Sequence, residues 1–345
     1  MSSAMMPRSY PQANKADGQN DLLEHYDIGQ KVGSGTYGVV YRGTQKSSGQ
    51  RVAMKEIRRL DDPLVCRRTL REIKFLQHLK HDNIVALLDV ARPNGFHSFS
   101  KACLVEEYMP QNLSQVIAKY DLNDRQISFF TLQMLAGLNA VHSAGIIHRD
   151  VKPENLLVGR NGELKICDFG LARAQNAGGK KDIKMTEYVA TRWYRAPEIM
   201  VSRYGKASDV WSSGCVLAEM LGGKVLFPGK NYTHQLDLIF NVLGSPTDDD
   251  LGGGYSSKSI HYIRTALPSR PRTPWRSIFP KASEESLSLL NRLLTFNMCS
   301  RITVEAALQH EFVQPWLRSS EGRYESVYKG QTFFDCDDAG PFFFF

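Results

Sequence analysis

The segment HRDVKPENLL, residues 148–157, holds side chains that could carry out phosphoryl transfer. Asp150 and Asn155 lie five residues apart, and Lys152 lies between them. In a constrained loop, such a carboxylate can accept the proton of a hydroxyl nucleophile, the amide can ligate magnesium, and the ammonium can neutralise charge on the transferred group. An Asp-Phe-Gly triplet begins at Asp168, and its carboxylate oxygen also suits magnesium. Each segment alone would be an ordinary turn, but their order and spacing predict magnesium-dependent phosphoryl transfer.

A second group of residues, nearer the amino terminus, fits phosphate binding. Gly33, Gly35 and Gly38, followed by Val40, form a GxGxxGxV pattern between two strand-like runs. Small residues there allow backbone N–H groups to approach phosphate oxygens. The next run, VAMK, ends at Lys55, a flexible point charge suited to the α and β phosphates of ATP. A glycine-rich hairpin without a ligand explains the loop alone equally well, but the strand that follows argues against a dinucleotide fold.

An amphipathic helix is expected to supply the acidic partner of Lys55. Apolar residues recur near helical spacing over residues 65–79, with charged residues largely between them. Glu72 lies in this stretch, within RTLREIKFL, and is the natural partner. A Lys–Glu pair of this kind orients the ammonium and couples the position of the helix to activity. A surface ion pair is the alternative interpretation.

The apolar pattern divides the chain into a strand-rich part and a helical part. Short β-branched runs broken by glycine predict antiparallel strands from residue 26 to 57, and two more apolar runs follow at 84–90 and 102–109. Beyond Pro110 the pattern becomes helical, and Asn123 with Gln126 predicts a capping box. We therefore expect an α+β fold with two lobes and one key helix in the amino lobe. The predicted parts are a disordered arm (1–22), an amino lobe (23–109), a carboxyl lobe (110–316) and a carboxyl-terminal extension (317–345).

Bulk composition predicts a soluble protein of a reducing compartment. The 345 residues are 42% hydrophobic and 23% charged, and no apolar run approaches the length of a membrane span. Six cysteines are widely spaced without metal-ligand patterns, which fits reduced thiols in the cytoplasm or nucleus. The net charge of +7 is scattered rather than gathered in a basic block, so acidic peptides or solubility explain it as well as nucleic acid does. We expect neither a nucleic-acid partner nor integral membrane association.

Together with Ala196-Pro197-Glu198, these motifs resemble the eukaryotic protein kinase family over about residues 24–316. The resemblance implies in-line transfer of the ATP γ-phosphoryl group, with magnesium, to a Ser or Thr hydroxyl of a protein. It implies catalytic roles for Asp150, Lys152, Lys55 and Glu72, and magnesium ligation by Asn155 and Asp168. It also implies that Glu198 pairs with Arg301, and that Asp209 braces the catalytic loop.

The same resemblance assigns the nucleotide site and shows one departure from the family. Glu106 falls at the gatekeeper position at the back of the adenine pocket, where an acid is unusual because a buried carboxylate is costly unless it is paired or protonated. A one-residue alignment slip is the alternative. The residues expected to contact ATP are Val32, Gly33, Gly35, Gly38, Val40, Ala53, Lys55, Glu107, Met109 and Leu157.

Within that family the chain is similar to mitogen-activated protein (MAP) kinases of the extracellular-signal-regulated type. The residues that carry this are the activation lip, MTEYVATRWYRAPE (185–198), and the segments LFPGKNYTHQLDLI and LGSP; a PSTAIRE-type cyclin-binding helix is absent. The resemblance implies activation by phosphorylation of Thr186 and Tyr188 by an upstream dual-specificity kinase, reversal by phosphatases, and Ser/Thr-Pro substrates. Arginines can capture such phosphates and order a loop. The predicted phosphate-capturing residues are Arg68, Arg71 and Arg149 for Thr186, and Arg192 and Arg195 for Tyr188.

Three alternatives stay open at this point. The lip could be an unmodified solvated segment, the chain could be a cyclin-dependent-like kinase that needs a partner subunit, or it could be a noncatalytic scaffold with a kinase fold. The segment after the last predicted helix, QPWLRSSEGRYE, lacks the acidic cluster with which many MAP kinases bind docking peptides. The tail QTFFDCDDAGPFFFF is rich in phenylalanine, and we expect it to dock on the chain itself.

Overall fold

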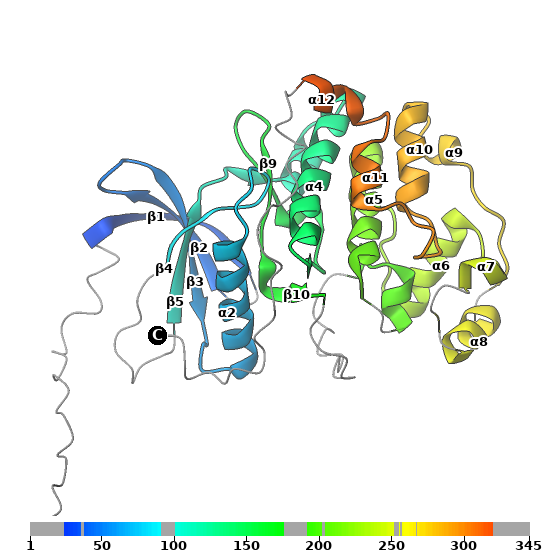
Figure 1. Cartoon of the computed structure of the whole chain (residues 1–345), viewed down its shortest axis with the longest axis horizontal. Coiled ribbons are helices and arrows are strands. Elements are labelled where there is room, and N and C mark those ends of the chain that lie inside the picture. Colours follow the sequence, from blue (N-terminus) through cyan, green and yellow to red (C-terminus); the bar gives the residue numbers. More distant parts are fainter. Residues whose placement is uncertain are drawn as a thin grey trace, which may run out of the picture. The chain divides into compact units, whose positions relative to one another are not determined.

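The computed structural model describes residues 24–35, 38–90, 101–175, 192–201, 204–251, 255, 257–266 and 268–319 (Figure 1). These residues form two compact units. The amino-terminal unit comprises the described residues up to Ile73 together with Ala86–Tyr108, and the carboxyl-terminal unit comprises Lys74–Val85 and the described residues from Met109 onward. The predicted arm and nearly all of the predicted extension lie outside the described residues, so their boundaries stay predictions.

A five-stranded antiparallel sheet forms most of the amino-terminal unit. Its strand order is β1-β2-β3-β5-β4. The hairpin of β1 and β2 closes at Gly35 opposite Gly38, and Lys55 on β3 lies between Val40 of β2 and Leu104 of β5. The strands are β1 (Tyr26–Gly35), β2 (Gly38–Gln45), β3 (Arg51–Arg58), β4 (Leu87–Val90) and β5 (Lys101–Glu107).

Helix α2 (Pro63–His78) is the predicted helix between the strands. The chain passes from the amino-terminal to the carboxyl-terminal unit within it, after Ile73. The helix buries Val65 near its start and packs Ile73 further along against Ile57 of β3 and Leu104 of β5. Apolar residues at helical spacing therefore bind α2 to the sheet that carries Lys55.

The carboxyl-terminal unit is built around the long helices α4 (Asp124–Ser143) and α5 (Lys206–Gly222), which pack against each other. The predicted capping box of Asn123 and Gln126 is present at the start of α4. Helix α5 is capped at its carboxyl end by Gly223, whose φ of 67° lies in the left-handed region that glycine adopts without strain. Helix α11 (Val304–Leu308) packs on α4, and α10 (Glu284–Leu293) packs on α5 (Figure 1).

Two small sheets and several short elements complete the carboxyl-terminal unit. The sheet orders are β6-β8-β9 and β10-β7. The strands are β6 (Gln111–Asn112), β7 (Ile146–Ile147), β8 (Leu156–Val158), β9 (Leu164–Ile166) and β10 (Arg173–Ala174), and the 3₁₀ helices are η1 (Pro153–Asn155), η2 (Phe169–Leu171) and η3 (Pro197–Val201). The other helices are α3 (Leu113–Lys119), α6 (Tyr232–Leu243), α7 (Asp248–Leu251), α8 (Ser257–Ala266), α9 (Trp275–Ile278) and α12 (Gln314–Ser319).

One strand-rich unit and one helical unit confirm the predicted α+β class. Across the described ranges, no helix combines the length and the apolar character that crossing a membrane requires.

Candidate active site

The catalytic loop, residues 148–155, holds the Asp150 carboxylate by one of its oxygens. The ammonium of Lys152 lies 2.7 Å from Asp150 Oδ2, and the amide nitrogen of Asn155 donates to the same oxygen at 2.8 Å. That nitrogen also donates to the backbone oxygen of Asp150 at 2.8 Å. Both side-chain bonds fall on Oδ2, so they fix the carboxylate without engaging Oδ1. The loop therefore presents an oriented carboxylate oxygen, as a proton acceptor requires.

Charge within this loop is balanced between Asp150 and Lys152. Burial raises the pKa of the Asp150 carboxyl above its ordinary value, and the Lys152 ammonium offsets part of that rise. Burial would lower the pKa of Lys152, but the carboxylates of Asp150 and Asp168 outweigh it and raise that pKa. Lys152 therefore stays a cation beside the loop, in a position to neutralise developing negative charge.

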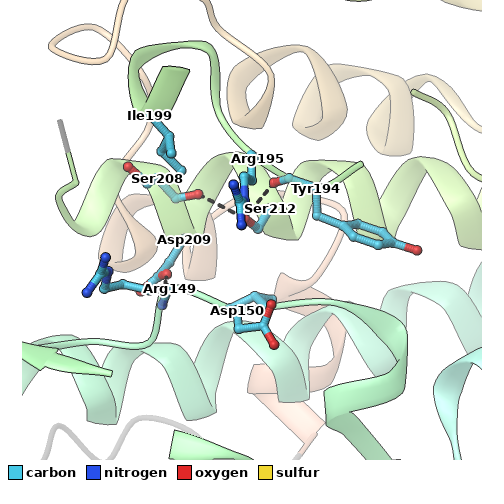
Figure 2. A pocket seen from close by; sticks show the side chains of 9 residues that line it. Arg149, Asp150, Tyr194, Arg195, Ile199, Ser208, Asp209 and Ser212 are labelled. Atoms are coloured by element: carbon cyan, nitrogen blue, oxygen red, sulfur yellow. Dashed lines mark hydrogen bonds between the residues drawn. The ribbon is translucent and has the colours of Figure 1, made fainter. Parts of the chain in front are cut away.

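The backbone that carries Asp150 is held by Asp209 of α5. Asp209 is 1% exposed, and its two oxygens accept the backbone N–H groups of His148 and Arg149, each at 2.8 Å. Figure 2 shows Asp209 beside Arg149, with Asp150 next along the chain. Arg149 has a φ of 71°, a conformation that is unfavourable for a residue other than glycine and that persists only where its surroundings hold it. The predicted bracing of the catalytic loop by Asp209 is confirmed.

The imidazole of His148 connects the loop to the segment that carries Asp168. Its Nδ1 accepts the backbone N–H of Asp150 at 3.3 Å, so Nε2 carries the proton and donates to the backbone oxygen of Cys167 at 3.1 Å. The backbone N–H of Cys167 donates in turn to the oxygen of Asn155 at 3.0 Å. Both backbone groups of Cys167 are thus bonded to the catalytic loop, which fixes the residue before Asp168.

Asp168 and Asn155 offer oxygens of the kind that magnesium binds. Asp168 follows β9 and has left-handed backbone angles, φ 61° and ψ 75°, and its side chain accepts the N–H of Gly170 at 3.4 Å. The amide nitrogen of Asn155 makes its bonds to Asp150, which leaves its oxygen for a ligand. Within the part of the chain that the structure describes, no group of three or more His, Cys, Asp or Glu side chains could hold a metal. Two oxygens from the protein suit magnesium, which is commonly held by one or two protein ligands together with phosphates.

Lys55 and Glu72 form the predicted ion pair within the amino-terminal unit. The ammonium of Lys55 lies 2.7 Å from Glu72 Oε1. The Glu72 side chain is 4% exposed and that of Lys55 is 25% exposed, so this pair is not the surface ion pair of the alternative interpretation. A half-buried ammonium held by a buried carboxylate has a defined direction, which suits phosphate positioning.

Packing within the sheet requires glycine at one position of the β1–β2 hairpin, Gly38, but not at another, Gly33. A Cβ at Gly38 would meet the backbone oxygen of Glu56 at 1.9 Å, so close approach of β2 and β3 requires glycine there. A Cβ at Gly33 would meet only the Cβ of Val40, at 3.9 Å. Packing within the sheet therefore explains Gly38, while Gly33 has no such constraint and stays a candidate for close approach of a phosphate.

The residues predicted for the ATP site and its gatekeeper position are divided between the two units. Val32, Ala53, Glu106 and Glu107 belong to the amino-terminal unit, and Met109 and Leu157 belong to the carboxyl-terminal unit. Glu106 is 8% exposed and lies between Ala53 of β3 and Leu87 of β4 in the sheet register. Glu106, which the sequence predicts at the gatekeeper position, is therefore buried and does not point outward into solvent, and its gatekeeper role stays a prediction.

Glu107 forms two hydrogen bonds that the sequence did not indicate. Its backbone N–H donates to the oxygen of Ala86 at 3.1 Å, and its Oε1 accepts the N–H of the same residue at 2.7 Å. These two bonds join the end of β5 to the residue that precedes β4.

The predicted phosphate-capturing arginines lie on different elements, and Thr186 and Tyr188 lie outside the described residues. Arg68 and Arg71 are on α2, and Arg71 is buried. The Arg149 guanidinium lies 4.1 Å from the ring centre of Tyr204. Arg192 donates to the backbone oxygen of Lys230 at 3.0 Å, and Arg195 donates to the hydroxyl of Tyr232 at 3.1 Å. Their capture of phosphate stays a prediction.

The predicted pair of Glu198 and Arg301 is confirmed as a buried, bidentate ion pair. The two guanidinium nitrogens lie 2.6 and 3.0 Å from the two carboxylate oxygens, and the side chains are 1% and 0% exposed. This pair ties η3, in which the activation lip ends, to the loop before α11.

Two buried polar pairs were missed by the sequence reasoning. The hydroxyl of Tyr194 donates to Glu219 of α5 at 2.6 Å, and His142 of α4 lies 2.9 Å from Asp209. The available signal was a polar residue within an apolar helical stretch, because Glu219 lies in CVLAEM and His142 follows Val141. Pattern alone does not reveal the partner.

Comparison with known proteins agrees with this geometry. A family model described as the protein kinase domain matches residues 26–313, which include both the Lys55–Glu72 pair and the catalytic loop. The chain is 48% identical over 316 residues to mitogen-activated protein kinase PMK1 of Pyricularia oryzae, covering 90% of this chain and 88% of the relative. It is 48% identical over 313 residues to mitogen-activated protein kinase mpkB of Aspergillus fumigatus, with coverages of 90% and 88%.

A third relative is extracellular signal-regulated kinase 1 of Candida albicans, which is 44% identical over 311 residues and is covered for 75% of its length. The chain therefore belongs to the protein kinase family and, within it, to the mitogen-activated protein kinases. This confirms the resemblance found in the sequence.

Proposed function

We propose that the chain transfers the γ-phosphoryl group of ATP to Ser or Thr hydroxyls followed by proline, and that phosphorylation of Thr186 and Tyr188 activates it. The observation that carries the phosphoryl-transfer assignment is the Asp150 carboxylate, which Lys152 and Asn155 hold by a single oxygen at 2.7 and 2.8 Å. The names of the relatives support the MAP kinase type of this activity.

In the proposed mechanism, Asp150 orients the substrate hydroxyl and accepts its proton at Oδ1, because Oδ2 is held by two donors. Lys152 stays protonated and neutralises charge that develops on the transferred group. The bonds from Asp209 to the loop backbone keep the Asp150 carboxylate in place, so little reorganisation is needed during the reaction.

ATP and magnesium are the proposed cofactors, and the donor chemistry fits them. Asn155 and Asp168 would hold magnesium, Lys55 would hold phosphate oxygens, and the β1–β2 hairpin would cover the phosphates. Magnesium would supply charge neutralisation at the phosphates. Val32, Val40, Ala53 and Leu157 would contact the adenine ring, with Glu107 and Met109 offering backbone groups and Glu106 behind them.

Several contacts support specificity for proline. Trp193 donates from Nε1 to the backbone oxygen of Gly229 at 3.2 Å, and its own backbone oxygen accepts from Gln235 at 3.2 Å. With the bond of Arg192 to Lys230, these contacts fix the lip at residues 192 and 193 to the loop before α6. We assign this segment to the recognition of the residue after the phosphoacceptor.

The proposed partners are Ser/Thr-Pro proteins, an upstream dual-specificity kinase and phosphatases, in the cytoplasm or nucleus. The test combines phosphosite mass spectrometry with a peptide-library assay on unmodified and activated protein. We expect turnover to rise with phosphorylation at residues 186 and 188 and to depend on proline after the phosphoacceptor. Full activity without modification, activation only by an added subunit, or no preference for proline would each overturn the corresponding part of the proposal.

A further inference from the structure

Two hydrogen bonds of Glu107 join segments that lie far apart in the sequence. Its backbone N–H donates to the oxygen of Ala86 at 3.1 Å, and its side-chain Oε1 accepts the N–H of Ala86 at 2.7 Å. Residues 86 and 107 continue the β4–β5 register, in which Leu87 faces Glu106. Facing residues of an antiparallel pair commonly exchange two backbone bonds, whereas here the side-chain carboxylate makes one of the two.

This pair lies beside two places where the chain passes between its units. Val85 belongs to the carboxyl-terminal unit and Ala86 to the amino-terminal unit, so the chain crosses between these two residues. The amino-terminal unit continues to Tyr108, so Glu107 lies one residue before the next crossing. The two hydrogen bonds therefore tie these crossings together on the amino-terminal side. Segments that connect two bodies are where hinge motion is absorbed, so a bond at this place restrains the backbone that would turn.

Ala86 is a fixed point to which Glu107 is tied. The N–H of the preceding residue, Val85, donates to the oxygen of Ile166 in β9 at 2.9 Å. The N–H of Ile166 donates in turn to the oxygen of Asn83 at 2.8 Å. Asn83 and Val85 are buried. Segment 83–86 is therefore held by β9, and through Ala86 it holds the end of β5.

The backbone at the end of β5 bears on nucleotide binding. The sequence predicts that peptide groups of Glu107 and Met109 contact the adenine ring, and both lie next to the crossing after Tyr108. Without the carboxylate bond, residue 107 keeps one backbone bond to Ala86, and the peptide groups beyond it gain freedom to turn. A nucleotide would then have to order these groups when it binds, which lowers its affinity.

We propose that the Glu107 side chain is a positioning residue for nucleotide binding, which acts through its bond to Ala86 on the backbone at the crossing after β5. In this role the carboxylate contacts no atom of the nucleotide, and the inference rests on the proposed function. The competing view is that the bond only stabilises the amino-terminal unit.

The test measures the dissociation constant of magnesium-ADP, by calorimetry, for three variants of the full-length chain. Glu107→Met keeps the side-chain length and removes the acceptor, Glu107→Gln keeps an oxygen at the same reach without the charge, and Glu107→Asp keeps the charge but is too short. We expect Glu107→Met to raise the dissociation constant about 3- to 10-fold, because the loss of one hydrogen bond commonly has an effect of this size. Glu107→Gln retains most of the affinity, and Glu107→Asp does not.

Two further measurements separate positioning from stability. In the nucleotide-free chain, amide hydrogen exchange at Ala86 should be about tenfold faster in Glu107→Met than in wild type, and close to wild type in Glu107→Gln. In turnover assays with a Ser/Thr-Pro peptide, KM for ATP should rise in Glu107→Met by a larger factor than kcat falls.

A matched control is Glu163→Met, which removes another glutamate oxygen that accepts a backbone N–H, that of Asn161 at 2.8 Å. This bond lies in the connection between β8 and β9, within one unit and away from the crossings. The control should therefore leave the dissociation constant of ADP within about twofold of wild type.

The order of affinities decides the outcome. If Glu107→Met does not fold, the comparison of Glu107→Gln with Glu107→Asp decides. Equal affinities for these two, a weaker affinity in Glu107→Gln than in Glu107→Asp, or a loss in Glu107→Met no larger than in Glu163→Met overturns the inference. A wild-type chain that binds ADP but transfers no phosphoryl group would instead refute the proposed function, so the two failures are distinguishable.

Discussion

Breaking the buried ion pair of Glu198 and Arg301 is expected to destabilise the carboxyl-terminal unit strongly. The substitution Arg301→Met removes the cation and leaves Glu198, 1% exposed, as an uncompensated buried charge. Removing one partner of a buried pair costs about 3–5 kcal/mol. The Arg301 guanidinium also donates to the backbone oxygens of Thr295, Ala207 and Phe296, at 2.9, 2.7 and 3.2 Å. The loss in free energy of unfolding for Arg301→Met is therefore expected at the upper end of that range.

The measurement is thermal and urea unfolding of the single variants Arg301→Met and Glu198→Gln and of the double variant. For a unit of this size, the expected cost lowers the thermal midpoint by about 6–20 °C. Groups in direct contact are not additive, so the double variant should cost less than the sum of the two singles by about 0.5–3 kcal/mol.

The matched control is Arg270→Met, which breaks the pair with Asp237, where both side chains are about one-third exposed. Pairs of this kind contribute about 0–1 kcal/mol when they are exposed to solvent. An Arg301→Met midpoint no lower than that of Arg270→Met, or additive single and double variants, would refute the reasoning from burial.

Two further predictions follow from the hairpin and from Asp209. Gly38→Ala should destabilise the amino-terminal unit by about 1–3 kcal/mol, because its Cβ would meet the oxygen of Glu56 at 1.9 Å, while Gly33→Ala should stay within about 0.5 kcal/mol in the same unfolding experiment. The depressed pKa of Asp209 contributes stability that is present above the unfolded-state value of about 4 and is lost as pH falls through the folded-state pKa. Urea unfolding of wild type and Asp209→Asn between pH 6 and pH 3 should show the advantage of wild type shrinking toward low pH, and a constant difference would contradict this.

Local parts of the structure were predictable because their signals lie close together in sequence. The Asn123 capping box, the helix that carries Glu72 and the alternation of the first strands each depend on residues within a few positions of one another. The order and spacing of Asp150, Asn155 and Asp168 identified the catalytic loop for the same reason.

Contacts between distant segments were predictable only where the family resemblance supplied them. The pair of Glu198 and Arg301 joins residues 103 positions apart, and no local sequence pattern predicts it. His142 and Asp209 are 67 positions apart, and the residues around the histidine carry no sign of its partner. The side-chain bond of Glu107 to Ala86 was missed because it depends on the meeting of two strand ends.

The most direct test of phosphoryl transfer by this chain is the single-turnover rate of Asp150→Asn with magnesium-ATP and a Ser/Thr-Pro peptide. General-base catalysis contributes about 10²- to 10⁴-fold, so the rate should fall by that factor. The dissociation constant for ATP should change less than about threefold, because the amide keeps the shape of the carboxylate. A rate within a few-fold of wild type would contradict the assignment of Asp150 as the group that accepts the hydroxyl proton.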